Sequence, residues 1–248
     1  KVDVIACEDT RTSGSLLKHF DIHNLLIAYH NFNEESSANG ILELLRDGKN
    51  IALISDAGYP LINDPGQKIV TLATSEGFNV VPVSGPSAFL NALVASGLVA
   101  QPFIFIGFLP QSHSDRVKKL KEYENYPMTM IFYEAPHRIE KCLKDCMEVF
   151  GDRKMTLARE LTKMHEEFLR GSISEILEVI DELRGEMVIV MDGNHEDKSK
   201  AIDMNTIIEM VNASVENGMS TKDAIKDAAK KTGISKNRIY DAVNSNRN

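Results

Sequence analysis

Five segments of the sequence group acids, bases and small residues at spacings that suit ligand chemistry. The most informative is 55–66, which runs Ser-Asp-Ala-Gly-Tyr-Pro-Leu-Ile-Asn-Asp-Pro-Gly directly after an apolar stretch. Small residues let a ligand approach the backbone closely, and carboxylates can accept hydrogen bonds from ligand amines or hydroxyls. The glycine and lysine pattern of a phosphate-binding P-loop is absent. The segment therefore predicts a ligand-binding turn, and the alternative is an ordinary strand-to-helix turn capped by Asp64.

The other four segments also lie at the end of a predicted strand or directly after it, where binding residues are common. They are 7–12 (CEDTRT), 84–88 (SGPSA), 132–138 (FYEAPHR) and 158–167 (ARELTKMHEE). Pro86 suits the first turn of a helix, whose free N–H groups can meet a ligand. Solvated charged faces, or a local ion pair between Asp9 and Arg11, are the simpler interpretation of each segment alone. Neither a nucleophile elbow nor a GxGxxG motif occurs, so the residues by themselves indicate a two-domain α/β ligand binder that is an enzyme.

Short apolar strands alternate with amphipathic helices through the first hundred residues. Strands are predicted at 2–6, 25–29, 51–55 and 79–83, and helices at 16–20, 36–47, 66–76 and 87–96. This alternation predicts a parallel sheet covered by helices, with ligands at the carboxyl ends of its strands. Because compact α/β proteins rarely start within a strand, we expect that the first domain lacks its first strand and loop.

The second half of the chain does not continue the regular alternation of strands and helices. Residues 101–110 read as a strand leaving the first domain, followed by strands at 128–133, 154–159 and 187–191 and helices at 115–123, 136–150 and 173–183. Residues 194–201 are polar and read as a linker. We therefore expect an N-terminal α/β domain (1–108), a second α/β domain (109–194), a linker (195–204) and a helical module (205–248).

Composition places the chain among soluble globular proteins of the cytoplasm. Hydrophobic residues make up 43% and charged residues 26%, and no apolar run reaches the roughly 18 residues that cross a bilayer. The three cysteines, Cys7, Cys142 and Cys146, suggest no disulfide framework. Cys142 and Cys146 lie four apart on a predicted helix, but the further ligands of a zinc site are missing, so no metal is expected.

The C-terminal module combines helices with basic charge. Helices are predicted at 205–217, 221–231 and 235–244, with Ser220 as a cap and Gly233 in a turn, a layout that resembles a helix-turn-helix. The chain has a net charge of −8, yet 222–238 holds six basic and two acidic residues. The module either binds nucleic acid or serves as a packing and dimerisation unit. In the first case four side chains would contact phosphates: Lys230, Lys231, Lys236 and Arg238.

The motifs in their order carry a family resemblance over residues 2–194. CEDTRTS, ISDAGYPLINDPG, VSGPSA, FIGFLP, FYEAPHR, ARELTKMHEE and GEMVIVMDG closely resemble the ribosomal RNA small subunit methyltransferase I family. That family is the cytidine ribose 2′-O-methyltransferase branch of the tetrapyrrole methylase superfamily. The resemblance implies two α/β domains, with a parallel sheet in the first and a mixed sheet in the second. It also implies S-adenosylmethionine in the cleft between them, 16S rRNA of the small ribosomal subunit as partner, and a homodimer.

Transferred by motif, the resemblance assigns the cofactor pocket to Asp56, Ala57, Tyr59, Ser87, Ala88, Tyr133, Leu161 and Met187. One departure is clear: the family begins with a strand and a GTPIGNL-like loop that forms part of this pocket, and nothing here matches it. This supports the expectation that upstream residues are missing.

Methyl transfer from a sulfonium needs in-line positioning and removal of a proton from a weakly acidic ribose hydroxyl. Asp9, Glu134, Glu160 and Lys163 are candidate bases or orienting groups, and Lys163 with Glu160 is favoured, provided that burial lowers the lysine pKa. Arg11, Arg138 and Arg159 would hold RNA phosphates. Two alternatives remain open: a methyltransferase of small tetrapyrroles, and a non-catalytic RNA-binding assembly module.

Overall fold

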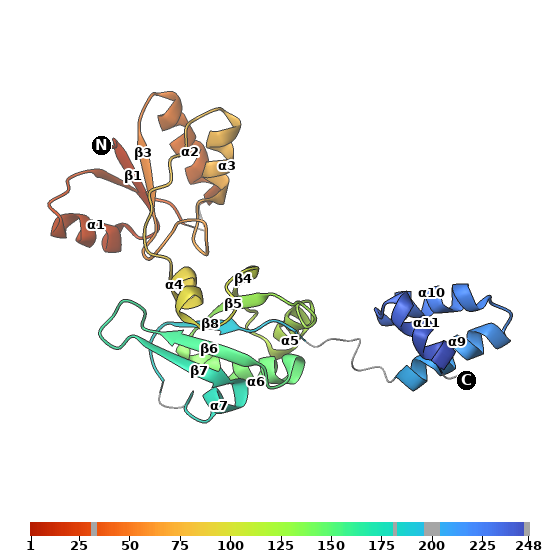
Figure 1. Ribbon diagram of the computed structural model, residues 1–248. Helices are drawn as coiled ribbons and strands as arrows, with labels where there is room; N and C mark the ends of the chain where they lie inside the picture. The colour runs from red at the N-terminus through yellow and green to blue at the C-terminus, as the bar shows by residue number, and fades with distance from the viewer. Residues whose placement is uncertain (31–33, 181–182, 196–203, 246–248) are drawn as a thin grey trace. The chain divides into compact units, whose positions relative to one another are not determined.

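The chain forms two compact units, 1–193 and 194–248. A computed structural model describes residues 1–30, 34–180, 183–195 and 204–245. The first unit contains two sheets, and the second contains only helices in its described part (Figure 1). Within the described residues, no helix combines the length and apolarity that a membrane crossing requires.

The first sheet is parallel, as predicted, with strand order β2-β1-β3. Its strands are β1 (Val4–Cys7), β2 (Leu25–Ala28) and β3 (Ile51–Ile54), and the helices between and after them are α1 (Thr10–His19), α2 (Glu34–Arg46) and α3 (Gln67–Ser75). Helices α2 and α3 pack on one face through a cluster that includes Tyr29, Ile41 and Ile69. The parallel pairing places the carboxyl ends of β1 and β3 side by side, which is where the motifs at 7–12 and 55–66 begin.

The prediction of a strand at 79–83 is wrong. These residues have no regular secondary structure and pair with no described strand, and Val80, Val81 and Val83 are 43%, 69% and 84% exposed. Their apolar, β-branched character favours a strand locally, but a strand also needs a neighbour with which to share backbone hydrogen bonds. Sequence periodicity reports the first condition and not the second.

The second sheet is mixed, with order β4-β5-β8-β6-β7. Its strands are β4 (Phe103–Phe108), β5 (Thr129–Glu134), β6 (Lys154–Arg159), β7 (Glu167–Ser172) and β8 (Met187–Met191). The helices of this region are α4 (Ala88–Ala95), α5 (His113–Lys121), η1 (Pro136–Arg138), α6 (Ile139–Phe150) and α7 (Ile173–Leu177). Only the β4–β5 pair is parallel among the described strands of this sheet.

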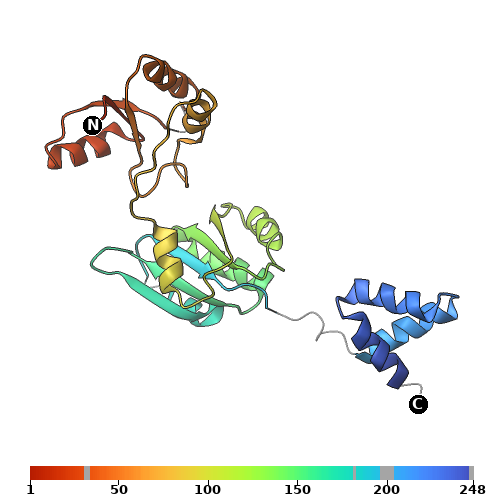
Figure 2. The same cartoon turned by 45° about the horizontal axis from the view of Figure 1, so that its top comes forward.

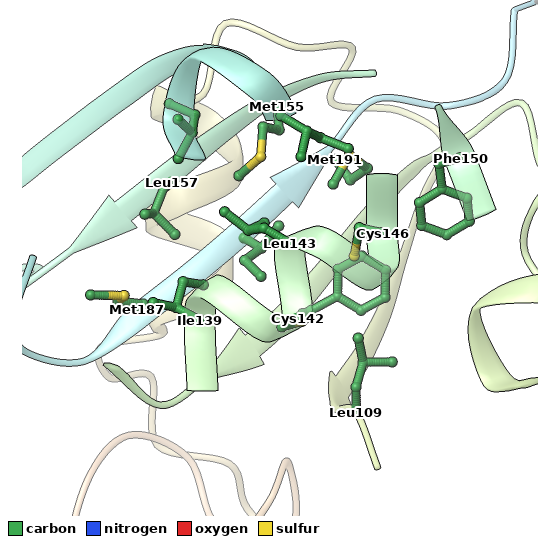
Figure 3. Packing of buried hydrophobic residues seen from close by; sticks show 14 of the residues in the cluster. Leu109, Ile139, Cys142, Leu143, Cys146, Phe150, Met155, Leu157, Met187 and Met191 are labelled. Atoms are coloured by element: carbon green, nitrogen blue, oxygen red, sulfur yellow. The ribbon is translucent and has the colours of Figure 1, made fainter. Parts of the chain in front are cut away.

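Helices cover both faces of this sheet. Helix α6 packs on one face, where Cys142, Leu143 and Cys146 meet Leu157 and Met191 (Figure 3). The two cysteines are free and fully buried in this core. Helix α4 lies on the opposite face (Figure 2), where Ala92 and Leu93 pack against Ile131 and Val190.

Two features of the second sheet differ from the sequence-based expectation. Strand β4 pairs with β5, so residues 103–108 belong to the second sheet and not to the first domain, where the predicted boundary of 1–108 had placed them. Strand β7 was missed because Glu167 and Arg170 interrupt its apolar pattern. It forms nonetheless, because it is the edge strand and needs to pair only with β6.

The second unit contains α9 (Met204–Glu216), α10 (Thr221–Thr232) and α11 (Lys236–Ser245), close to the three predicted ranges. Ser220 caps α10 by accepting a hydrogen bond from the Asp223 N–H, and Gly233 ends it in a left-handed conformation. Ile207, Ile225 and Ile239 join the three helices in one core. Most of the predicted linker, residues 196–203, lies outside the described residues.

Candidate active site

Two loops of the first unit are joined by a tyrosine. The Tyr59 hydroxyl accepts a hydrogen bond of 2.8 Å from the Gly85 N–H, which connects the segment after β3 to the segment before α4. The Ser55 hydroxyl lies inside the first loop, within hydrogen-bonding distance of the carbonyl oxygens of Ala57 (3.2 Å) and Gly58 (3.1 Å). Gly58 has φ +76° and would bring a Cβ to 3.8 Å from the Pro86 carbonyl oxygen, so the two loops lie in contact.

The second loop leads directly into α4 and then to the second sheet. Ser87 is the N-cap residue of α4, yet its hydroxyl makes no capping hydrogen bond to this helix, and Ala88 begins the helix. At the next position, the Phe89 N–H donates to the Tyr133 hydroxyl at 3.3 Å. Burial raises the pKa of Tyr133, and the Asp64 carboxylate adds to the rise. The loops and Tyr133 therefore share one region.

Strand register brings a further set of predicted residues to a common sheet end. Met187 in β8 lies opposite Glu134 of β5 on one side and opposite Arg159 of β6 on the other. Leu161 follows β6 and packs with Tyr133 in the cluster on the α4 face. Of the residues that the resemblance assigned to the cofactor pocket, Tyr133 and Leu161 thus lie on the α4 face of the sheet. The Met187 side chain is buried on the α6 face, so only its backbone shares this sheet end.

Glu160 and Lys163 form an ion-paired turn after β6. Lys163 Nζ lies 3.1 Å from Glu160 Oε1 and 3.0 Å from Glu186 Oε2. Glu160 and Thr162 have positive φ values of 50° and 66°, a strained arrangement for residues other than glycine and one that often marks functional sites. A Cβ at Gly185 would overlap the Glu160 carboxyl group, so this glycine leaves the space that the glutamate occupies.

The electrostatics of this turn do not favour the role of proton acceptor that was expected for Lys163. The hydrogen bond to Glu186, and then that to Glu160, raise the lysine pKa, whereas a general base would need it lowered. The pKa of Glu160 is lowered by Lys163. The condition under which Lys163 could accept a proton is therefore not met. Its ammonium is instead held between the carboxylates of Glu160 and Glu186.

Asp9 is also a poor candidate for a base. It is the N-cap residue of α1, and its carboxylate accepts from the Arg11 backbone N–H (2.8 Å) and side-chain Nη2 (2.7 Å). These bonds lower the pKa of Asp9 to about 2, so the group is a weak proton acceptor at neutral pH. The simpler interpretation of this pair, a local ion pair, is the one that the structure has.

Two carboxyl groups that the sequence reasoning did not select have raised pKa values. Burial and then the nearby Asp64 and Asp56 raise the pKa of Glu8, at the end of β1. Burial and then Asp56 raise the pKa of Asp64, against a hydrogen bond from Ser55. The sequence does show acidic residues in the CED and NDPG motifs, which lie in the segments that follow β1 and β3. That the acids of the two segments are close in space depends on the pairing of β1 with β3.

The arginines predicted to hold phosphates are ion-paired. Arg138 Nε lies 2.8 Å from Oε1 of the buried Glu134, and Arg159 Nε lies 2.6 Å from Glu167 Oε2. The Arg11 side chain is exposed beside Asp9. The four basic residues predicted in the tail belong to the second unit: Lys230 and Lys231 on α10, with Lys231 paired to Asp227 (2.7 Å), and Lys236 and Arg238 on α11.

The first unit thus combines a parallel three-stranded sheet with a mixed five-stranded sheet, and acidic loops follow the strands of the first sheet. The profile of the tetrapyrrole (corrin/porphyrin) methylases matches residues 1–177. The chain therefore belongs to the tetrapyrrole methylase family.

Curated relatives narrow the assignment within that family. The chain is 43% identical to ribosomal RNA small subunit methyltransferase I of Bacillus subtilis, over 97% of this chain and 85% of that protein. It is 40% identical to the Halalkalibacterium halodurans protein of the same name and 39% identical to that of Streptococcus pyogenes, again with 97% and 85% covered. Its place within the family is thus with the ribosomal RNA small subunit methyltransferase I proteins.

Solved structures confirm the fold. The chain resembles the methyltransferase CobJ with a TM-score of 0.54 and 16% identity, over 78% of this chain and 95% of that one. It also resembles cobalt precorrin-4 methyltransferase, CbiF, with a TM-score of 0.52 and 16% identity, over 77% of this chain and 84% of that one. At this identity the likeness shows the arrangement of the elements and not the substrate.

Proposed function

We propose that the protein transfers a methyl group from S-adenosylmethionine to the ribose 2′-hydroxyl of a cytidine in 16S rRNA of the small ribosomal subunit. The observation that carries this proposal is the identity of 38–43% with proteins named ribosomal RNA small subunit methyltransferase I, over 97% of the chain. The protein would act in the cytoplasm as a homodimer, and light scattering of the purified chain tests the dimer.

The loops described above fit the charge of this cofactor. S-adenosylmethionine carries a positive sulfonium and a positive amino group beside its carboxylate. Glu8 and Asp64 each have a pKa raised in part by neighbouring carboxylates, which indicates a negative potential at the strand ends that attracts a cation. Asp56, Ala57 and Tyr59 from one loop, and Ser87 and Ala88 from the other, would hold the nucleoside. Tyr133 and the backbone near Leu161 and Met187 would complete the pocket.

Bound there, the cofactor supplies an electrophilic methyl group, so the chain must orient the ribose and accept its proton. A carboxylate with a raised pKa is a stronger base than an ordinary one. Glu8 and Asp64 meet this requirement, and Asp9, Glu160 and Lys163 do not. We therefore assign the acceptance of the ribose hydroxyl proton to Asp64 or Glu8. Lys163, as a positive charge, would help to orient the RNA.

One assay separates the proposal from its alternatives. Small subunits that lack ribose methylation are incubated with the protein and cofactor labelled in its methyl group, and the RNA is digested to nucleosides. Labelled 2′-O-methylcytidine supports the proposal. Label in an added porphyrinoid with unlabelled RNA would establish the tetrapyrrole alternative, and subunit binding without label would establish an assembly module.

A further inference from the structure

An open pocket of about 520 Å³ lies at the end of β4 and is lined in part by Phe108, Pro110, Lys119 and Arg138. None of the motifs assigned to the cofactor includes Phe108 or Lys119. The lining combines an aromatic ring with two cationic side chains on different elements, since Lys119 belongs to α5 and Arg138 to η1. This combination suits a ligand that has both a flat unsaturated ring and negative charge.

A bulge in β4 sets the direction of Phe108. The pairing of β4 with β5 shifts register between Phe105 and Gly107, which leaves Ile106 as the extra residue. Gly107 has φ +75°, a conformation that other residues rarely adopt. Phe108 therefore lies opposite Tyr133, and the two rings meet edge to face at 5.6 Å. A bulge changes the direction of the side chains that follow it. Phe108 remains 55% exposed, and its ring therefore presents an aromatic surface at the pocket.

The two cations are each held by a carboxylate. Glu134 has no exposed side-chain surface, and its Oε1 accepts from Arg138 Nε and Nη2 at 2.8 and 2.5 Å. Lys119 is paired with Glu122 at 2.7 Å, and its ammonium lies 5.3 Å from the centre of the Tyr123 ring. The hydrogen bonds to Glu122 and Tyr123 raise the pKa of Lys119, so it is charged at neutral pH. Both side chains are therefore fixed positive charges at the pocket.

The pocket adjoins the loops of the candidate active site. A Cβ at Gly107 would lie 2.7 Å from Oδ1 of Asn63, which belongs to the loop of Asp56 and Tyr59. On the other side, Tyr133 contacts Phe108 with its ring and α4 with its hydroxyl. A ring placed on Phe108 is therefore next to the residues that we assign to the cofactor.

We propose that this pocket receives a nucleotide of the substrate RNA, with its base stacked on Phe108 and an adjacent phosphate held by Arg138 and Lys119. The assignment rests on the proposed function and adds to it the substrate subsite. Aromatic side chains stack on bases of any sequence, and a planar guanidinium matches the geometry of a phosphate. An acidic peptide would satisfy the cations, but it would leave the exposed face of Phe108 without a partner.

The absence of tryptophan from the chain permits a direct test. The Phe108→Trp variant carries a single indole at the pocket, and its emission is recorded while a short oligoribocytidine is added. Phe20→Trp is the control, because Phe20 is similarly exposed (62%) but is the C-cap residue of α1. Quenching by the RNA at Phe108→Trp alone is the expected result. No quenching, or equal quenching by an acidic peptide, overturns the proposal.

A second measurement follows turnover. Phe108→Ala should raise the KM for small subunits about 5- to 150-fold, the range expected for the loss of one stacked base. Binding of S-adenosylhomocysteine should be unchanged, and Phe108→Tyr should restore the wild-type KM. Lys119→Ala should raise KM, whereas Lys118→Ala, on the same helix but outside the pocket, should not. An unchanged KM in Phe108→Ala overturns the subsite.

The two proposals can fail separately. If the wild-type protein leaves subunits unlabelled, the proposed function fails. The emission titration does not depend on turnover, so it still tests whether the pocket binds a nucleotide.

Discussion

The Tyr59 hydroxyl accepts a hydrogen bond of 2.8 Å from the backbone N–H of Gly85, across 26 residues of sequence. This one bond connects the acidic loop after β3 to the loop that begins α4. Because both loops supply residues that we assign to the cofactor, their relative position should depend on it.

Tyr59→Phe should therefore weaken cofactor binding while leaving the fold intact. A neutral hydrogen bond contributes about 0.5 to 1.5 kcal/mol, which corresponds to an affinity for S-adenosylhomocysteine about 2- to 13-fold lower by calorimetry. Tyr240→Phe, an exposed tyrosine on α11, is the matched control. Equal affinities for wild type and Tyr59→Phe would show that the bond does not order the site.

Lys163→Ala should lower kcat more than it lowers cofactor affinity. The expected loss is roughly tenfold, smaller than the 100-fold or more that follows removal of a general base. Since its pKa is raised by Glu186 and Glu160, Lys163 stays protonated through the neutral range, and the pH profile of kcat should keep its shape. A much larger loss together with a missing limb in the pH profile would instead identify Lys163 as the base.

Asp9→Asn should reduce stability in a pH-dependent way. The pKa of Asp9 in the folded protein is lowered to about 2 from an ordinary value of 3.8. Its charge therefore stabilises the fold fully at pH values above the pKa of the unfolded chain. That contribution is lost as the pH falls through the folded value. Asparagine keeps the N-cap function, so the substitution isolates the charge. The Tm difference between wild type and Asp9→Asn should be larger at about pH 6 than at about pH 3, and the reverse order would contradict this assignment.

Arg116→Ala should strongly destabilise the first unit. Both partners of its ion pair with Asp145 are almost fully buried, at 4% and 8% side-chain exposure and a distance of 2.5 Å. The arginine also donates to the carbonyl oxygens of Pro110 and Gln111. Without the arginine, the buried Asp145 keeps only His113, whose Nδ1 lies 2.9 Å from Asp145 Oδ1. Breaking a buried ion pair by removing one partner costs about 3–5 kcal/mol, measurable by urea unfolding. Lys118→Ala, exposed on the same helix, should change stability little, and similar losses for both variants would refute the argument.

The C-terminal module should contribute to RNA binding through charge. Replacing Lys230, Lys231, Lys236 and Arg238 with Gln should weaken subunit binding at low salt. It should also reduce the slope of log affinity against log salt by about 0.7 to 0.9 for each phosphate that the module no longer neutralises. Lys18→Gln and Lys49→Gln, in the first unit, serve as a control pair. An unchanged slope would favour the alternative of a packing or dimerisation unit.

Much of the molecule could be predicted from the sequence by itself, because the relevant signals are short-range. The caps at Ser220 and Gly233, the apolar strands and the order of the strand-end motifs are all read within a few residues. They were sufficient for the α/β fold, for the three terminal helices and for the family.

Only the tertiary structure decided the properties that arise between distant segments. Burial raises the pKa of Glu8, and the pairing of β1 with β3 brings it near Asp64 and Asp56, which add to the rise. Glu186 raises the pKa of Lys163 from 23 residues away. Residues 79–83 form no strand because no described strand pairs with them. Phe108 faces Tyr133 because of the register between β4 and β5. Charge, burial and hydrogen bonding act through space, whereas sequence spacing reports only what lies close along the chain.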